Sequence, residues 1–184
     1  VDHALVLSSY IVSEQRPSVQ EILEVVGDDP QISVIAGVSY YEYRAADLAD
    51  LRVLLREGRI SGLKLYPGYE PFYPSDPKLA PVYALAEEFD INVALGAWLD
   101  RRKDFNAEQV EKAINIAWRH ENVVRVIIGN EALLRGDITE TELAAHLDRA
   151  REQLFQPVST AEPWNVWMAN PELANHVDFI AVHL

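Results

Sequence analysis

The 184-residue sequence predicts an α/β fold with a parallel sheet, of the kind found in (βα) barrels. Three observations lead to this prediction. Short apolar runs rich in β-branched residues recur along the chain, and segments with apolar residues three and four positions apart lie between them. The two patterns alternate about every 25 to 30 residues, which is the order expected for right-handed crossovers between parallel strands.

Seven short runs are the expected strands. Most of them are apolar at successive positions, as expected for strands covered on both faces. They comprise residues 4–8, 32–38, 62–66, 92–98, 123–128, 157–160 and 178–183.

Helical spacing spans residues 19–26, 48–55, 82–89, 110–117 and 143–150. Ser18 with Glu21 and Thr139 with Glu142 match the capping box that begins many helices, and Asn106 with Gln109 is a similar pair. A weaker helix over residues 163–177 is interrupted by Pro171.

A barrel is favoured over a doubly wound sheet because no expected strand is followed by a Gly-rich phosphate-binding loop. Barrels of this type usually have eight strands and roughly 200 or more residues. We therefore expect one barrel-like domain over residues 1–184 that is incomplete or closed by self-association.

The composition excludes several classes of partner. A formal charge of -13 would repel nucleic acid and anionic lipid, so a neutral or cationic ligand is favoured. There is no cysteine, no apolar run long enough to cross a bilayer, and no basic-then-apolar leader at the start. We expect a soluble protein, in a compartment that the sequence does not reveal.

Functional groups in parallel α/β folds collect beyond the C-terminal ends of the strands. Tyrosines, tryptophans and carboxylates predominate there, a mixture that suits a neutral saccharide. The alternative is that these rings pack beneath loops. The positions concerned are Ser9, Tyr10, Glu14, Tyr40, Tyr41, Glu42, Lys64, Tyr66, Tyr69, Trp98, Asp100, Asn130, Glu131, Glu162, Trp164 and His183.

Glu131 and Glu162 end successive strands, so their carboxyl groups could lie close together. One of two neighbouring carboxyls is then protonated beside an ionised partner, as glycoside hydrolysis requires. The alternative makes Glu131 a helix-start charge and Glu162 a solvated loop residue.

Neither a metal nor a cofactor is predicted. The five histidines form no HxH or HExxH pair, and only His183 occupies a strand end.

From about residue 92 onward the chain resembles bacterial members of glycoside hydrolase family 17, the β-1,3-glucan hydrolases and glucosyl-transfer enzymes. The segments VALGAWLDRR, VIIGNEALLRGD, PVSTAEPWNVW and VDFIAVHL follow in the family's order. The resemblance implies a retaining (βα)₈ enzyme in which Glu131 is the acid/base and Asn130 contacts a sugar 2-hydroxyl. It also implies that Trp98, Glu162, Trp164 and His183 line the subsites.

The family's nucleophilic glutamate follows the next strand, beyond Leu184. The resemblance therefore implies an acid/base without its nucleophile. If the strand at residues 4–8 follows the strand at residues 178–183, Glu14 is the nearest replacement, and Glu162 is the other acid considered.

Residues 2–89 resemble instead a metal-dependent amidohydrolase of the (βα)₈ type, through DHALVLSSYIV, SVIAGVSYYEYR and GLKLYPGYEPFYPSDPKLAPVYALAEEF. The HxH strand of that family has no counterpart, and only Lys64 lies in a strand that could reach a metal site. We interpret the chain as an engineered chimera joined near residues 89–93.

The leading hypothesis is a folded scaffold without efficient turnover that retains weak saccharide binding. The second is a working retaining glucan hydrolase or transglycosylase that uses Glu131, and the third is a metal-dependent hydrolase that uses Lys64 and His183. We also expect a homodimer or other self-association, because the edges of an unclosed sheet are exposed.

Overall fold

The computed structural model describes residues 3–67 and 69–183. Outside the described residues lie the start of the amidohydrolase-like half, one glycine of GLKLYPGYE and the final leucine of VDFIAVHL. The chain divides into two compact units, Val1–Ile91 and Asn92–Leu184, with a boundary inside the junction predicted at residues 89–93. The strands form two sheets, of three and four strands, and the single barrel-like domain stays a prediction.

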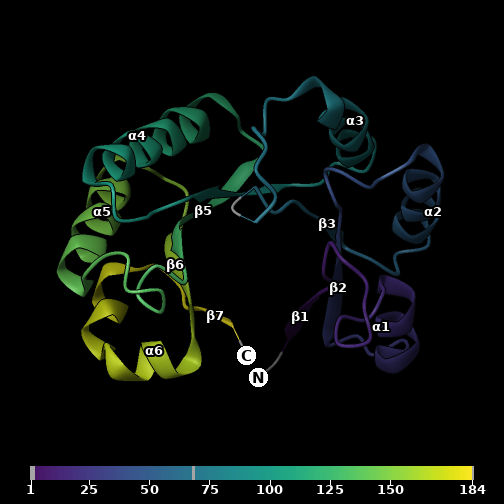
Figure 1. Ribbon diagram of the computed structural model, residues 1–184, viewed down its shortest axis with the longest axis horizontal. Coiled ribbons are helices and arrows are strands. Elements are labelled where there is room, and N and C mark those ends of the chain that lie inside the picture. Colours follow the sequence, from purple (N-terminus) through teal and green to yellow (C-terminus); the bar gives the residue numbers. More distant parts are fainter. Residues whose placement is uncertain (1–2, 68, 184) are drawn as a thin grey trace. The chain divides into compact units, whose positions relative to one another are not determined.

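The first unit is a three-stranded parallel sheet in the order β1-β2-β3, with Ala4 beside Ile32 and Ala36 beside Leu63. Its helices lie together on one side of the sheet (Figure 1). The elements are β1 (Ala4–Leu7), α1 (Val19–Val26), β2 (Ile32–Gly37), α2 (Ala45–Arg56), β3 (Gly62–Lys64), the 3₁₀ turn η1 (Pro77–Leu79) and α3 (Ala80–Glu88).

The core of this unit lies between β2 and the three helices. Val34 and Ala36 point from the middle strand into a cluster that includes the fully buried Leu79 and Leu85. Each buried leucine stabilises the unit by roughly 1.5 to 3 kcal/mol. The ion pair between Arg52 Nε and Glu88 Oε2, at 2.9 Å, joins α2 to α3.

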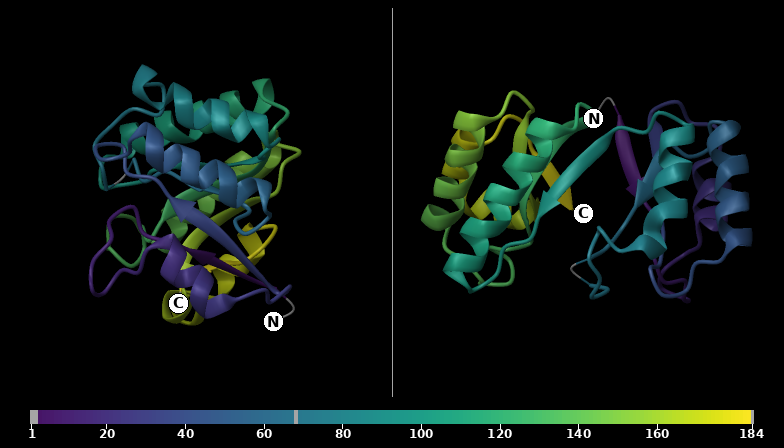
Figure 2. Two further views of the ribbon diagram at one scale, coloured as in Figure 1. Left: turned by 90° about the vertical axis from the view of Figure 1, so that its right-hand side faces the viewer. Right: turned by 90° about the horizontal axis from the view of Figure 1, so that it is seen from above.

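The second unit is a four-stranded parallel sheet in the order β4-β5-β6-β7. Its helices form one layer and its strands a second (Figure 2). The elements are β4 (Val93–Ala97), α4 (Lys103–Arg119), β5 (Val123–Asn130), α5 (Glu140–Gln153), β6 (Val158–Pro163), α6 (Trp164–Ala169), the 3₁₀ helix η2 (Pro171–His176) and β7 (Ala181–His183).

The central strands β5 and β6 carry the core of the second unit. Val126, Ile128 and Val158 are fully buried and pack in one cluster with Leu143 and Leu147 of α5. This packing fixes the directions of the two strands whose C-terminal ends bear the Asn-Glu pair and Glu162.

The parallel α/β class and all seven predicted strands are confirmed. The capping boxes at Ser18 and Thr139 are confirmed as well, since each hydroxyl accepts a hydrogen bond from the amide three residues on. Pro171 separates α6 from η2 as expected. No helix in the described part of the chain is long and apolar enough to span a membrane.

The predicted start of α4 at Asn106 is wrong. The helix begins at Lys103, and Asn106 lies buried in its first turns. The Asn106 side chain accepts a hydrogen bond from the Asp100 amide at 2.8 Å and donates one to the Asp100 carbonyl at 2.6 Å. It fixes the loop after β4 instead of beginning the helix.

Candidate functional site

The C-terminal ends of β4 to β7 gather most of the predicted site residues within the second unit. Trp98 follows β4, Asn130 ends β5 and Glu131 comes next. On the neighbouring strands, Glu162 lies near the end of β6 and His183 ends β7, while Trp164 begins α6. These six residues are called the rim below.

A β-bulge shapes the end of β5. Ile128 and Gly129 together lie opposite Thr160, because Ile127 pairs with Ser159 and Asn130 with Ala161. Gly129 has a φ of 81°, a conformation that glycine adopts without strain. The bulge re-aims the chain at Asn130 and Glu131, as bulges beside functional sites commonly do.

Glu131 itself has a φ of 53°, in the left-handed region that a residue with a Cβ adopts only at a cost of about 1 to 2 kcal/mol. Its amide donates a 2.8 Å hydrogen bond to the Ala161 carbonyl, which holds this conformation. The next helix, α5, starts at Glu140, so Glu131 is not a helix-start charge. Backbone strain of this kind is common at functional residues.

The carboxylate of Glu131 contacts the imidazole of His183. Their atoms Oε1 and Nδ1 are 2.7 Å apart, and both side chains are partly exposed, at 25% and 32%. His183 Nδ1 can donate its proton to the ionised carboxylate or accept the proton of the carboxylic acid. The pair can therefore hold Glu131 in place in either protonation state.

Glu162 has a different environment. It is fully buried, and its two oxygens accept hydrogen bonds from the amides of Leu133, at 2.8 Å, and Leu134, at 3.3 Å. Burial raises the pKa of this carboxyl; the two amides and Arg135 oppose the rise, and Glu131 adds to it. The solvated-loop alternative is wrong, and the contacts favour a residue that fixes the loop after Glu131.

Arg135 connects the loops that follow β4 and β5. Its guanidinium donates to the Asn130 carbonyl, and to the Leu99 carbonyl at 2.8 Å. It also pairs with Asp137 at 2.7 Å and stacks 4.3 Å from the centre of the Trp98 ring. Arg135 thus fixes both the Asn-Glu turn and a predicted subsite tryptophan.

The two rim tryptophans differ in setting. Trp164 is 60% exposed, so its ring is available to a ligand. Trp98 lies against Arg135, which limits its movement. The structure thus brings together the carboxylate, the amide residue and the aromatic rings that the sequence predicts for this part of the site.

The other three predicted site residues, Tyr40, Tyr66 and Glu14, belong to the first unit. The Tyr40 hydroxyl donates to Asp76 at 2.9 Å, and the Tyr66 hydroxyl donates to the Ser8 carbonyl at 2.9 Å. Glu14 is exposed in the turn after β1. Their participation in a site with Glu131 stays a prediction, because these contacts are all within the first unit.

Lys64, at the end of β3, lies 5.3 Å from the centre of the Tyr66 ring, and burial lowers the pKa of its amine. Within residues 3–67 and 69–183, no three histidine, aspartate or glutamate side chains are grouped as a metal site would need.

Sequence reasoning missed Arg135 and the amides that bind Glu162. A signal was present, since LLRGD follows the Asn-Glu pair and places Arg135 two residues before Asp137. The contact with Trp98 has no local signal, because it joins loops that are far apart in the sequence.

Comparison with known proteins gives one family match. The model of the BtgE/BtgC glycoside hydrolase domain matches residues 72–184. The chain belongs to this family. The BtgE/BtgC match starts before the junction predicted near residues 89–93, so it includes part of the first unit. No curated protein matches the chain.

A solved structure has a similar fold. The glycoside hydrolase family 17 β-1,3-glucanosyltransferase from Rhizomucor miehei matches with a TM-score of 0.58 and 21% identity over 82% of this chain. This chain spans 55% of that structure's length. This likeness supports a parallel, barrel-like fold. Neither match supports an amidohydrolase-like first half, so that resemblance and the chimeric origin stay predictions.

Proposed function

We propose that this chain binds β-linked glucan at the rim of the second unit and that Glu131 is the general acid/base toward the glycosidic oxygen. One observation carries the proposal: a strained, partly exposed glutamate is held by His183 at the end of β5. The family match and the β-1,3-glucanosyltransferase activity named for the similar structure support the same substrate class.

In the proposed reaction, protonated Glu131 gives its proton to the glycosidic oxygen as the bond from the anomeric carbon to that oxygen breaks. A second carboxylate forms a bond to the anomeric carbon on the opposite face. Water then attacks that carbon as its bond to the second carboxylate breaks, the carboxylate leaves, and the water gives a proton to Glu131. Two displacements at the same carbon retain the configuration. If a sugar hydroxyl replaces water, the outcome is glucosyl transfer.

The second carboxylate decides how fast this reaction runs. Retention needs two carboxyls about 5 to 5.5 Å apart. Both Glu162 oxygens already accept backbone hydrogen bonds, so Glu162 is poorly suited to attack a sugar. Covalent labelling, described below, is the way to identify which of the two acids predicted from the sequence, Glu14 or Glu162, acts as the nucleophile.

The proposal is tested by incubating the chain with β-1,3-linked glucose oligosaccharides and measuring released reducing sugar. Glu131→Gln should lower turnover by about 10² to 10⁴-fold, the usual contribution of an acid/base. Glu121→Gln, at an exposed position on the opposite end of β5, is the matched control and should retain full activity. Equal turnover by all three proteins would refute the role of Glu131.

The second candidate function is saccharide binding without efficient turnover. The engagement of Glu162 by two amides favours it, because the predicted acid on the neighbouring strand is then poorly suited to act as a nucleophile. Treatment with a 2-fluoro glucosyl fluoride separates the two functions. A trapped adduct on a glutamate supports hydrolysis, whereas saturable oligosaccharide binding without any adduct supports the binding function.

Self-association through sheet edges is also proposed. Strands β4 and β7 are the outer strands of the four-stranded sheet, and outer strands offer unpaired backbone groups. Light scattering at two protein concentrations checks this proposal, and a constant monomer mass at both would exclude it.

A further inference from the structure

A second aromatic surface lies in the same unit, away from the rim. Trp118, near the end of α4, is 63% exposed, and Phe155, in the linker between α5 and β6, is 93% exposed. Their ring centres are 6.3 Å apart, and the planes are inclined by 55°. Both precede the N-terminal ends of strands, whereas the rim lies at the C-terminal ends. Large rings this exposed commonly mark a binding site.

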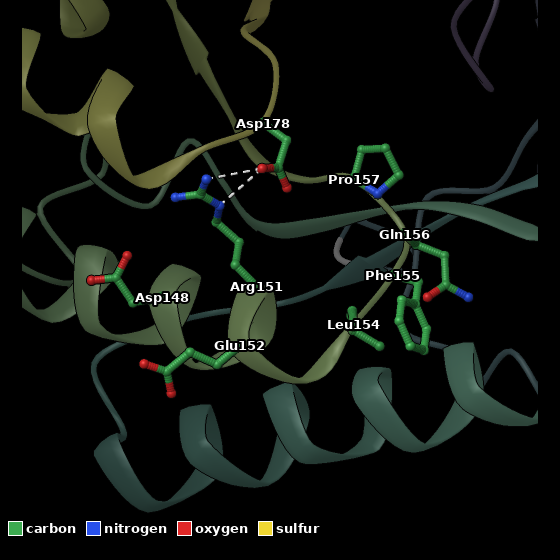
Figure 3. A pocket seen from close by; sticks show the side chains of 8 residues that line it. All are labelled: Asp148, Arg151, Glu152, Leu154, Phe155, Gln156, Pro157 and Asp178. Carbon is green, nitrogen blue, oxygen red and sulfur yellow. Dashed lines mark hydrogen bonds and ion pairs between the residues drawn. The ribbon is translucent and has the colours of Figure 1, made fainter.

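Two shallow hollows lie on either side of Phe155 and are together called the groove below. One lies between α4 and α5. The other lies along the linker to β6 (Figure 3). Figure 3 shows the Phe155 ring extending from the linker on the side of α4. Both hollows share Glu152, Leu154 and Phe155. A groove of this form suits an extended chain more than a compact ligand.

Hydrogen bonds hold Trp118 and the linker that carries Phe155 in place before any ligand binds. The Trp118 indole donates to the Gln153 carbonyl at 3.0 Å, which fixes the ring against the end of α5. The Gln156 amide donates to the Ala117 carbonyl at 3.0 Å, which ties the linker to α4. The Trp118 ring, fixed in this way, loses little conformational freedom on binding, a general advantage in recognition.

The charges around the groove argue against an ionic ligand. Arg149 pairs with Glu111 at 2.6 Å, and Arg151 pairs with Asp178 at 3.0 Å, so both cations are already neutralised. The Glu152 side chain lines both hollows, and its carboxylate can accept hydrogen bonds from hydroxyl groups. Two rings and Leu154 form a smaller apolar surface than a stable protein interface needs, about 800 Å² per partner.

From these observations we infer that Trp118 and Phe155 form an auxiliary saccharide-binding surface that holds a neutral β-glucan chain away from the rim. The apolar C–H faces of successive sugar rings would stack on the two side chains, and Glu152 would accept hydroxyl hydrogen bonds. This inference takes its ligand class from the proposed function. The auxiliary surface would help to retain the protein on long or insoluble glucan, which a single short site does not do.

The indole N–H signals of 15N-labelled protein test the inference. The chain has four tryptophans, so each indole reports one place: Trp98 and Trp164 the rim, Trp118 the auxiliary surface, and buried Trp167 a control. Addition of a β-1,3-linked glucose hexasaccharide should shift Trp118 saturably. Shifts of the Trp98 and Trp164 signals alone would overturn the auxiliary surface and leave the proposed function intact. A shift of the Trp118 signal alone would overturn the rim as the glucan site and support the auxiliary surface.

Retention on insoluble β-1,3-glucan provides the variant test. Phe155→Ala should weaken retention about fivefold, as expected for loss of one aromatic contact, with turnover of short oligosaccharides unchanged. Tyr73→Ala removes a ring of similar exposure, 81%, in the first unit and should change nothing. Equal retention of Phe155→Ala and the parent, or a Trp118 shift with polylysine but not with glucan, would refute the inference.

Discussion

His183 ends β7 and Glu131 directly follows β5, and these strands are not neighbours, yet Nδ1 of the imidazole is 2.7 Å from Oε1 of the carboxylate. The contact passes over the end of β6, which separates β5 from β7. It depends on the bulge at Gly129, which re-aims the end of β5, and on the left-handed backbone of Glu131. The position of the proposed acid/base is therefore set by three strands together.

His183→Phe should lower glucan turnover by about 10 to 100-fold, because a carboxyl displaced by 1 Å transfers its proton poorly. His183→Asn keeps a hydrogen-bond donor on a side chain of similar reach and should restore part of the rate. The measurement is turnover across a pH series for both variants, with chemical denaturation to confirm folding. If both variants retain the parent rate, His183 has no positioning role.

Arg135→Lys should weaken saccharide affinity and lower the free energy of unfolding by about 1 to 3 kcal/mol, since lysine cannot make the same forked set of hydrogen bonds. The stacking contact at Trp98 is also lost in this variant. Arg101→Lys is the matched control, because Arg101 also pairs with Asp137 but its side chain is 76% exposed. Urea denaturation of both variants checks the prediction, which fails if they lose the same stability.

Glu162 should produce a distinctive pH dependence of stability. Its folded-state pKa is raised, chiefly by burial, so the folded protein holds this proton to a higher pH than the unfolded chain does. Protonated Glu162 therefore stabilises the folded state. This stabilisation is fully present below the pKa of Glu162 in the unfolded chain and is lost as pH rises through its pKa in the folded protein.

Glu162→Gln removes this titration. The stability of the parent relative to the variant should therefore rise as pH falls from neutral through the folded pKa of Glu162 toward 4.5, the ordinary value. Urea denaturation at a series of pH values measures the difference directly. A difference that falls, or stays flat, over that interval would contradict the burial effect.

Thr139→Ala should lower the free energy of unfolding by about 1 kcal/mol, because the hydroxyl accepts the Glu142 amide at the start of α5. Thr141→Ala, at an exposed position in the same helix, is the control and should have little effect. Lys103 and the capping contacts hold the pKa of Glu142 at about 2, so the carboxylate stays ionised at neutral pH. Thermal unfolding of the two variants measures the difference, and Thr139→Ala should unfold at a lower temperature than Thr141→Ala.

Local patterns in the sequence predict most of the fold. The strands recur as short apolar runs, although the helices of each unit cover only one face of its sheet and Leu5 and Leu7 of β1 are exposed. Ser18 and Thr139 mark helix starts through contacts three residues away. The capping pattern is misleading at Asn106, because the hydrogen-bond partner of this side chain lies in the preceding loop.

The rim is predicted less completely, because its decisive contacts are long-range. Strand order places Glu131 near Glu162, but it does not show that the Leu133 and Leu134 amides donate hydrogen bonds to the Glu162 carboxylate. Stacking of Arg135 on Trp98 likewise joins positions 37 residues apart in the chain. The role of each acid follows from these contacts and not from its place at a strand end.

The most direct measurement is titration of the 15N-labelled parent chain with the β-1,3-linked hexasaccharide while the Trp98, Trp164 and His183 ring signals are followed. Saturable shifts at all three, with the buried Trp167 indole unmoved, are the predicted result. Unchanged signals from Trp98, Trp164 and His183 at millimolar ligand would contradict the assignment of the Glu131 rim as a glucan site.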